Sequence, residues 1–225
     1  MIKEKLLVSS EFFYDRIAVA YDELLTHQDL GVRELVESQF LERVSNGCVL
    51  DFGGGTGLDL EWLSRSQKLV YFLEPSVRMR SVAKDRCQGY KGYIKILDEE
   101  LDFKQWKMNS HPFEPKVNGI LANFAVFNCI SELKLLFQSF YHITAKDSFV
   151  LATVLKPASR FHQLKYLFRA KKRSELTYSS YEGLQHVAYR YRLEDFSAAI
   201  KDLFILTAFQ PVPGSDLSLL ILKRK

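Results

Sequence analysis

The 225-residue sequence predicts an α/β domain with a doubly wound, mostly parallel sheet of about seven strands and a helical cap. Two observations favour this fold. Short apolar runs, typical of buried parallel strands, alternate with segments whose apolar residues recur every three or four positions, as in amphipathic helices. A glycine-rich segment at residues 53–57 follows the first of these runs, where a strand of such a sheet meets a loop.

The elements are predicted in chain order. Helical periodicity predicts helices at residues 11–25, 29–44, 58–63, 76–86 and 131–143. Apolar runs predict strands at residues 48–50, 68–73, 93–97, 117–123 and 148–155. The last two strands, at residues 203–209 and 217–222, are separated by a Pro-Val-Pro-Gly-Ser turn, which favours an antiparallel hairpin. Residues 158–192 are the least sheet-like part of the chain.

Composition excludes several classes of protein. With 47% hydrophobic and 26% charged residues, the chain is neither disordered, nor collagen-like, nor a disulfide-stapled miniprotein. Its three cysteines cannot all pair and form no CxxC unit, so we expect a reducing compartment and no metal centre. No apolar run is long enough for a signal-peptide core or a membrane span, so we expect a soluble, cytoplasmic protein.

The segment Val49-Leu-Asp-Phe-Gly-Gly-Gly-Thr-Gly57 is the most informative one. A glycine-rich turn between a strand and a helix lets a ligand approach bare backbone. Free N–H groups there favour an anion, such as a pyrophosphate or an amino-acid carboxylate. The dinucleotide fingerprint Gly-x-Gly-x-x-Gly/Ala fails, because Leu58 stands where its third small residue is required. This mismatch disfavours a nicotinamide or flavin cofactor.

Three acidic residues lie at the ends of successive predicted strands. We expect Asp51 to hold the glycine loop by accepting backbone N–H groups, and its charge would repel a pyrophosphate. Glu74 is placed to accept hydrogen bonds from both hydroxyls of a ribose. Asp98 can accept a hydrogen bond from the exocyclic amine of a purine. Together these acids suit a nucleoside with a free ribose, an amino group and no phosphate.

Over most of its length the chain resembles the class I S-adenosylmethionine-dependent methyltransferases. Residues 14–22 are similar to the N-terminal helix of the quinone-biosynthesis-like branch of this family. The other matching segments, in the family's order and spacing, are residues 49–57, 72–76, 98–103, 119–124 and 148–153. The resemblance implies a Rossmann-like methyltransferase fold with strand order 3-2-1-4-5-7-6, and S-adenosylmethionine as the cofactor.

The resemblance also assigns roles to the matching residues. Those that would hold the methionine portion, or lie near it, are Gly53, Gly54, Gly55, the supporting Asp51, Tyr21 and the backbone of Asn123. Those around the adenosine are Glu74 on the ribose hydroxyls, Pro75 and Ser76 beside the adenine, and Asp98 at its amino group. On the acceptor side, Asn128 and His162 follow the fourth and fifth strands.

No residue stands out as a catalytic base. The five histidines are scattered and none has metal-ligand spacing, so each is more typical of a surface or hydrogen-bonded core position. Methyl transfer places few demands on the protein, because the sulfonium activates the methyl group and the protein mainly positions the acceptor. The missing base is therefore compatible with a methyltransferase. Two alternatives stay open: a nicotinamide-dependent oxidoreductase and a non-catalytic S-adenosylmethionine-binding module.

The predicted single domain has four parts. Residues 1–46 form N-terminal cap helices, 47–155 the cofactor-binding core, 156–201 a cap insertion and 202–225 the closing hairpin. The insertion has ten Lys or Arg against four Asp or Glu, interleaved with aromatics. A basic, aromatic cap suits a small-molecule or lipid-like acceptor, a membrane surface or RNA, although a solvated helical face explains the same charges. It contains no recognisable RNA-binding module.

Overall fold

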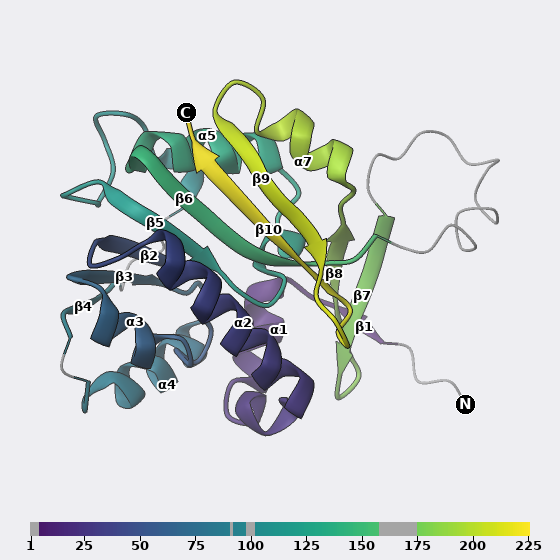
Figure 1. Cartoon of the computed structure of the whole chain (residues 1–225). Coiled ribbons are helices and arrows are strands. Elements are labelled where there is room, and N and C mark those ends of the chain that lie inside the picture. The colour runs from purple at the N-terminus through teal and green to yellow at the C-terminus, as the bar shows by residue number, and fades with distance from the viewer. Residues whose placement is uncertain (1–4, 91, 98–101, 158–174) are drawn as a thin grey trace.

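The computed structural model describes residues 5–90, 92–97, 102–157 and 175–225. Its main sheet has seven strands in the order β4-β3-β2-β5-β6-β10-β9 (Figure 1). These strands are β2 (Cys48–Phe52), β3 (Leu69–Leu73), β4 (Ile94–Ile96), β5 (Val117–Ala122), β6 (Thr144–Leu155), β9 (Phe204–Pro211) and β10 (Leu217–Arg224). The first five pair in parallel, whereas β10 runs antiparallel to β6 and β9. Counted along the chain, the order is 3-2-1-4-5-7-6, which confirms the predicted fold and topology.

Helices cover both faces of this sheet (Figure 1). On one face lie α2 (His27–Arg43), α3 (Leu60–Ser66) and α4 (Val77–Cys87), and on the other lie α5 (Leu133–Ile143) and α7 (Leu193–Ala199). Within β2, Val49 packs under the first group and Leu50 under the second, because successive side chains of a strand point to opposite faces. This two-sided burial explains why the strands are nearly continuous apolar runs.

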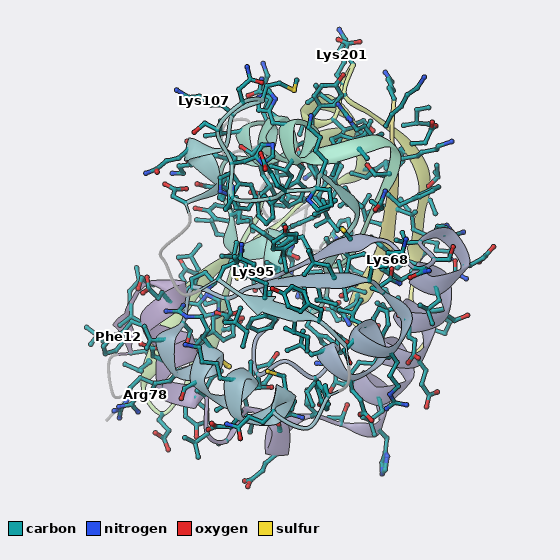
Figure 2. All side chains as sticks on the ribbon, turned by 90° about the vertical axis from the view of Figure 1, so that its left-hand side faces the viewer. Phe12, Lys68, Arg78, Lys95, Lys107 and Lys201 are labelled. Atoms are coloured by element: carbon teal, nitrogen blue, oxygen red, sulfur yellow. The ribbon has the colours of Figure 1, made fainter. Side chains whose placement is uncertain are left out.

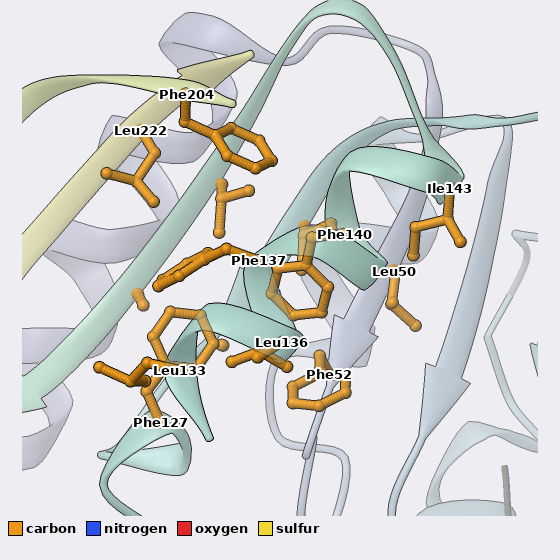
Figure 3. Close-up of a cluster of buried hydrophobic side chains, with 14 of the residues drawn as sticks. Leu50, Phe52, Phe127, Leu133, Leu136, Phe137, Phe140, Ile143, Phe204 and Leu222 are labelled. Atoms are coloured by element: carbon orange, nitrogen blue, oxygen red, sulfur yellow. The ribbon is translucent and has the colours of Figure 1, made fainter. Parts of the chain in front are cut away.

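Phenylalanines of α5 form the centre of one hydrophobic core (Figure 3). Phe137 is fully buried, and its ring centroid lies 5.6 Å from that of Phe127 and 6.1 Å from that of Phe204. Both ring pairs meet edge to face, the arrangement that aromatic quadrupoles favour. These contacts hold the short helix η3 (Val126–Cys129), which follows β5, against the body of the domain.

A second, three-stranded sheet was not predicted. It consists of β1 (Leu6–Leu7), β8 (Leu184–Arg190) and β7 (Glu175–Tyr181), with β8 in the middle. The expectation that residues 158–192 are the least sheet-like was wrong for the described part. Glu182 and Gly183, with φ of 45° and 81°, form the tight turn that lets β7 and β8 pair as an antiparallel hairpin. The helical cap was therefore predicted correctly for the N-terminal segment, whereas residues 175–190 form a β-hairpin. Residues 158–174 lie outside the described residues.

The N-terminal helices lie against both the second sheet and α4. The predicted helix at residues 11–25 is two elements, α1 (Ser10–Ile17) and the 3₁₀ helix η1 (Tyr21–Leu24). Phe13 and Ile17 of α1 are buried together with Met79 of α4. Phe12, on the opposite side of α1, and Arg78 of α4 point to solvent (Figure 2). Within the described ranges, none of the helices combines the length and apolar composition needed to cross a bilayer.

Candidate functional site

A pocket opens at the carboxyl ends of β2, β3 and β5, the edge at which open α/β sheets bind ligands. The cavity has a volume of about 120 Å³ and is partly open to solvent. The glycine loop, the end of β3 and the end of β5 form one part of its wall. The rest comes from α1, η1, α2, α4 and η3, so segments far apart in the sequence close around it.

The backbone N–H groups of the glycine loop are donated within the protein. Gly53 N and Gly54 N donate to the carbonyl of Leu73 at 2.7 and 3.3 Å. Gly55 N donates to Oε2 of Glu74 at 2.9 Å. The expectation of free N–H groups is therefore wrong at these three glycines, which leave no donor for a pyrophosphate.

Close packing around the loop leaves no room for a side chain at Gly53 or Gly54. At Gly53, which has a φ of +71°, a Cβ would lie 2.5 Å from Cγ1 of Val126. At Gly54 a Cβ would lie 2.3 Å from the ring of Phe72 and 2.5 Å from Oδ2 of Asp51. Real Cβ atoms do not approach other atoms so closely, so any side chain at Gly54 would displace the loop. The glycine loop consequently packs directly against the ends of β2 and β3.

Glu74 joins the end of β3 to the glycine loop. Its side chain is buried, with Oε2 accepting from Gly55 N at 2.9 Å and Oε1 accepting from Ser76 N at 2.8 Å. Burial raises the pKa of Glu74 to about 6, although the two backbone hydrogen bonds act in the opposite direction. Each carboxylate oxygen has further acceptor capacity, so Glu74 can still receive hydroxyl groups from a ligand.

Asp51 is a buried carboxylate with no hydrogen-bond partner. It is 1% exposed, and neither of its oxygens has a partner among the described residues. Burial raises its pKa well above the usual value, Asp59 adds to the rise, and Arg33 opposes it. The expectation that Asp51 holds the loop by accepting N–H groups was wrong, because Glu74 accepts from the loop instead. A buried acid of this kind favours a positive charge in the neighbouring pocket.

Arg33 of α2 is the one cation that lines the pocket within the described part of the chain. It donates to Oδ2 of Asp59 at 2.7 Å, and its guanidinium lies 4.4 Å from the ring centroid of Phe124. The same Asp59 oxygen accepts from Nδ2 of Asn123 at 3.1 Å. Asn123 thus lies at the pocket as predicted, and its side-chain amide is held by the Asp59 carboxylate, which also binds Arg33.

Two phenols from the N-terminal segment line the pocket. Tyr21 lies there as predicted, and burial raises its pKa to about 12. Tyr14 is also a lining residue, and burial raises its pKa well above the usual value. Both hydroxyls therefore stay protonated at neutral pH and act as hydrogen-bonding groups without charge.

Polar contacts fasten this N-terminal segment over the loop. Thr56 of the glycine loop donates through Oγ1 to Asp22 of η1 at 2.6 Å, and Arg86 of α4 bonds to the same carboxylate. At the other end, Asp15 of α1 accepts from Oγ of Ser76 at 2.5 Å. These contacts link η1 and α1 to the two elements that follow β2 and β3.

The predicted cofactor residues that line the pocket are Tyr21, Gly53, Gly54, Gly55, Glu74, Pro75 and Asn123. Ser76 is fully buried beside it, where its hydroxyl caps α4 by accepting from Met79 N at 3.1 Å. Asn128 is also fully buried: it donates to the carbonyl of Tyr189 and accepts from Leu155 N, so it braces η3. Asp98 and His162 lie outside the described residues.

Several residues that line the pocket were not predicted as site residues from the sequence, notably Tyr14, Arg33, Asp59 and Cys129. Tyr14 begins the N-terminal segment that resembles the family, so a signal for it was present. Arg33 and Asp59 meet across 26 residues and belong to no local motif. Cys129 is positioned only by the turn of η3 after β5.

Comparison with known proteins gives the family of the chain and its fold. The family described as "Methyltransferase domain" matches residues 24–201. A relative from Anoxybacillus flavithermus, named as an uncharacterized methyltransferase, is 32% identical over 110 residues, which cover 47% of this chain and 49% of the relative. The chain thus spans about half the length of the curated relatives it matches.

Solved structures share the fold at low identity. The N-methyltransferase NodS from Bradyrhizobium japonicum WM9, in complex with S-adenosyl-L-homocysteine, has a TM-score of 0.68 and 9% identity over 96% of this chain and 99% of that one. Magnesium protoporphyrin IX methyltransferase (ChlM) from Synechocystis PCC 6803, with the same compound bound, has a TM-score of 0.63 and 15% identity over 96% and 95%. Because the family match extends over most of the sequence, the chain belongs to the methyltransferase domain family.

Proposed function

We propose that this protein is an S-adenosylmethionine-dependent methyltransferase that acts on a small-molecule or lipid-like acceptor. One observation carries the proposal: Glu74 closes the glycine loop from the end of β3, while the unpartnered carboxylate of Asp51 lies buried behind Gly54. Membership of the family supports it, as do the S-adenosyl-L-homocysteine complexes of NodS and ChlM.

The residues fit the adenosyl portion of this cofactor. Glu74 is fixed by two backbone N–H groups, so its carboxylate is preorganised to accept from the ribose hydroxyls. Pro75 and Met79 continue the pocket wall beyond it and offer apolar surface to a purine. At Gly55 an added Cβ would have no other atom within 4 Å, so the bare backbone there is open to close approach by a ligand.

The charges around the pocket fit a cationic ligand. Asp51, Asp59 and Glu74 are acidic, whereas Arg33 is the cation that lines the pocket within the described residues and is already paired with Asp59. S-adenosylmethionine has a sulfonium and an ammonium against a single carboxylate. Its net positive charge would offset the unpaired Asp51, at a site where burial strengthens the attraction.

The nicotinamide alternative finds less support. Dinucleotides place a pyrophosphate on free backbone N–H groups at a glycine loop. Here Gly53, Gly54 and Gly55 donate their N–H groups to Leu73 and Glu74, and the buried Asp51 would repel the phosphates. The same arrangement suits a nucleoside without phosphates.

The chain contributes positioning and exclusion of water to methyl transfer. When bound, the cofactor supplies a methyl group that its sulfonium has already activated. The hydrogen bond between Thr56 and Asp22 holds η1 over the loop, and Tyr14 and Tyr21 close the pocket from that side. Holding an acceptor at attack distance in a dry pocket accounts for a large part of the rate enhancement in such reactions.

The part of the pocket wall available to an acceptor has little charge, because it is formed by Tyr14, Phe124, Val126 and Cys129. Such a wall favours an acceptor with an apolar body. In the described part of the cap, Arg190 bonds to the carboxylate of Asp216, and Lys156 donates to backbone carbonyls of the turn between β9 and β10. These two cations are committed to structural contacts, which favours a small organic or lipid-like acceptor over RNA.

Calorimetric titration with S-adenosyl-L-homocysteine tests the cofactor. We expect one site per chain, and affinity weaker by at least about tenfold in Glu74→Gln and Asp51→Asn. Glu61→Gln, an exposed carboxylate on α3, is the matched control and should stay within about twofold of wild type. Absence of binding to the wild type, or no effect of either variant, would contradict the proposal.

A release assay for S-adenosyl-L-homocysteine over panels of phenols, amines and lipid-like alcohols tests the transfer itself. Turnover of at least one class is expected. Binding without turnover of any acceptor, also in a metabolite extract, would instead favour the non-catalytic binding module. Fluorescence of titrated NADH should stay unchanged, and a binding signal would favour the oxidoreductase.

A further inference from the structure

The pocket wall formed by α1 and η3 contains a group of polar side chains, which we call the wall cluster: Ser10, Tyr14, Cys129 and His186. The first three line the pocket, and His186 lies behind them on β8, 1% exposed. Ser10 Oγ and His186 Nδ1 are 3.2 Å apart, within hydrogen-bond distance, although 176 residues separate them in the sequence. Docking of the β7–β8 hairpin therefore brings an imidazole to the hydroxyl of a residue that lines the pocket.

The surroundings of His186 favour the neutral imidazole. Its ring lies 4.4 Å from that of Phe13 and 5.3 Å from that of Tyr14, and its Nε2 has no partner among the described residues. Burial lowers its pKa, and a backbone hydrogen bond at Val187 opposes this in part. The titratable group in contact with it is Tyr14 from α1, its neighbour on β7 is Ser179, and Cys129 of η3 interacts with Ser10 and Tyr14.

The other titratable members of the wall cluster are protonated at neutral pH. Burial raises the pKa of Tyr14, and it also raises that of Cys129. Neither can take up a proton near pH 7, whereas a neutral imidazole can. Glu11 also lines the pocket, but it is exposed to solvent.

We propose that Ser10 and His186 form a proton relay that accepts the proton lost by the acceptor during methyl transfer. This inference rests on the proposed function. As the bond from the acceptor's heteroatom to the methyl carbon forms, the carbon–sulfur bond breaks and its electron pair goes to sulfur. The acceptor's proton passes to Ser10 Oγ, and the hydroxyl proton of Ser10 passes to Nδ1 of His186. After product release the imidazolium returns its proton to water through Ser10.

In this relay Ser10 is the catalytic residue, because it lines the pocket that receives the acceptor. His186 is a positioning residue that acts through Ser10 by keeping Nδ1 free to receive its proton. The relay requires an acceptor with a protonated hydroxyl, amine or thiol group, so it narrows the substrate class to such molecules. It also gives the β7–β8 hairpin a role beyond covering the pocket.

Imidazole ¹⁵N NMR of the whole protein tests the pair without an acceptor. At pH 7 we expect His186 to be neutral, with Nε2 protonated and Nδ1 unprotonated. Ser10→Ala should shift the Nδ1 resonance of His186 and leave that of His142 unchanged. His142 is a matched control, since burial also lowers its pKa but it lies outside the pocket. A protonated Nδ1 at pH 7, or no shift in Ser10→Ala, would overturn the relay.

Kinetics with an acceptor found by the release assay test the function of the pair. Ser10→Ala and His186→Gln should lower kcat at pH 7 by about 100-fold, the scale of general-base catalysis, and flatten the acidic limb of the pH profile. Their affinity for S-adenosyl-L-homocysteine should stay within about twofold of wild type, which also shows that they fold. His142→Gln should keep wild-type kcat and pH profile.

The outcomes separate the two proposals. A wild type that does not bind S-adenosyl-L-homocysteine, or that binds it and methylates nothing, overturns the proposed function and the relay with it. A wild type that methylates its acceptor while His186→Gln keeps the acidic limb overturns the relay alone. Loss of that limb in Glu11→Gln, with His186→Gln unaffected, would assign the base to Glu11 and overturn the relay as well.

Discussion

Glu74 and Gly55 are joined by a hydrogen bond of 2.9 Å from the glycine N–H to Oε2 of the carboxylate, across 19 residues of sequence. The other oxygen of Glu74 accepts from Ser76 N, at the start of α4. One buried side chain thus fixes the glycine loop after β2, the end of β3 and the first turn of the next helix. The group that we propose to bind the ribose is thus the same group that fixes the loop beside it.

The raised pKa of Glu74 predicts a pH-dependent affinity for S-adenosyl-L-homocysteine. In the proposed complex ribose hydroxyls donate to the charged carboxylate, whose pKa in the free protein is about 6. Affinity should therefore fall as the pH is lowered through 6, by up to about tenfold per pH unit, and Glu74→Gln should remove this dependence. Calorimetry between pH 5 and 7.5 measures it. A wild-type affinity that does not change over this range would contradict the role of Glu74.

The raised pKa of Glu74 also predicts how the stability of the ligand-free protein depends on pH. Because the pKa is raised from 4.5 to about 6, the contribution of Glu74 to stability is fully present below pH 4.5 and is lost as the pH rises through 6. A shift of this size corresponds to about 2 kcal/mol. Denaturant unfolding of wild type and Glu74→Gln, each at pH 5 and pH 7.5, should show the difference. If the free energy of unfolding depended on pH in the same way in both proteins, the raised pKa of Glu74 would be contradicted.

Gly54→Ala should damage both stability and ligand binding. The added Cβ would lie 2.3 Å from Phe72 and 2.5 Å from Asp51, so we expect a loss of about 1–3 kcal/mol and no measurable binding of S-adenosyl-L-homocysteine. Gly31→Ala is the control: this glycine lies within α2, a Cβ there would have no other atom within 4 Å, and alanine should stabilise by about 0.5–1 kcal/mol. Urea unfolding and calorimetry measure both effects, and equal behaviour of the two variants would refute the packing argument.

The contact between Asp22 and Thr56 should control how long a ligand stays bound. Asp22→Asn weakens the link from η1 to the glycine loop and to Arg86, so the dissociation rate should rise about fivefold, which corresponds to about 1 kcal/mol. Stopped-flow displacement of S-adenosyl-L-homocysteine measures this rate. Arg65→Met, which removes an exposed ion pair on α3, should leave it unchanged. An unchanged rate in Asp22→Asn would mean that η1 does not retain the ligand.

Phe137→Ala should be severely destabilising. The side chain is fully buried and meets the rings of Phe127, Phe196 and Phe204, so removing it should cost about 3–5 kcal/mol (Figure 3). Phe12→Ala, at a residue that is 50% exposed, should cost less than about 1 kcal/mol. Urea midpoints compare the two variants. A cost for Phe137→Ala no larger than that of Phe12→Ala would show that this cluster is not the core.

The sequence predicted the part of the fold that local patterns determine. The apolar runs and the Gly53–Gly57 segment located β2 to β6, and Glu74 was found because it ends β3. The β7–β8 hairpin was missed because β7, with the sequence Glu-Leu-Thr-Tyr-Ser-Ser-Tyr, has one aliphatic residue and therefore no apolar run. The one sequence signal for its turn is Gly183, since glycine adopts the positive φ of 81° observed there without strain.

The remaining site residues depend on contacts that no short motif records. Arg33 and Asp59 come together because α2 packs beside the residues that precede α3, and Ser10 meets His186 only once β8 pairs with β1. Asp51 was predicted from its position, but the role predicted for it was wrong. Whether it accepts loop N–H groups depends on how the loop lies, and Gly53 and Gly54 donate to the Leu73 carbonyl instead.

A crystal structure of the protein with S-adenosyl-L-homocysteine tests the central claim most directly. We predict density for the ligand beside Gly53–Gly55, with both ribose hydroxyls within hydrogen-bond distance of the Glu74 carboxylate. Density for the ligand elsewhere, or in this pocket with its ribose out of reach of Glu74, would contradict the account.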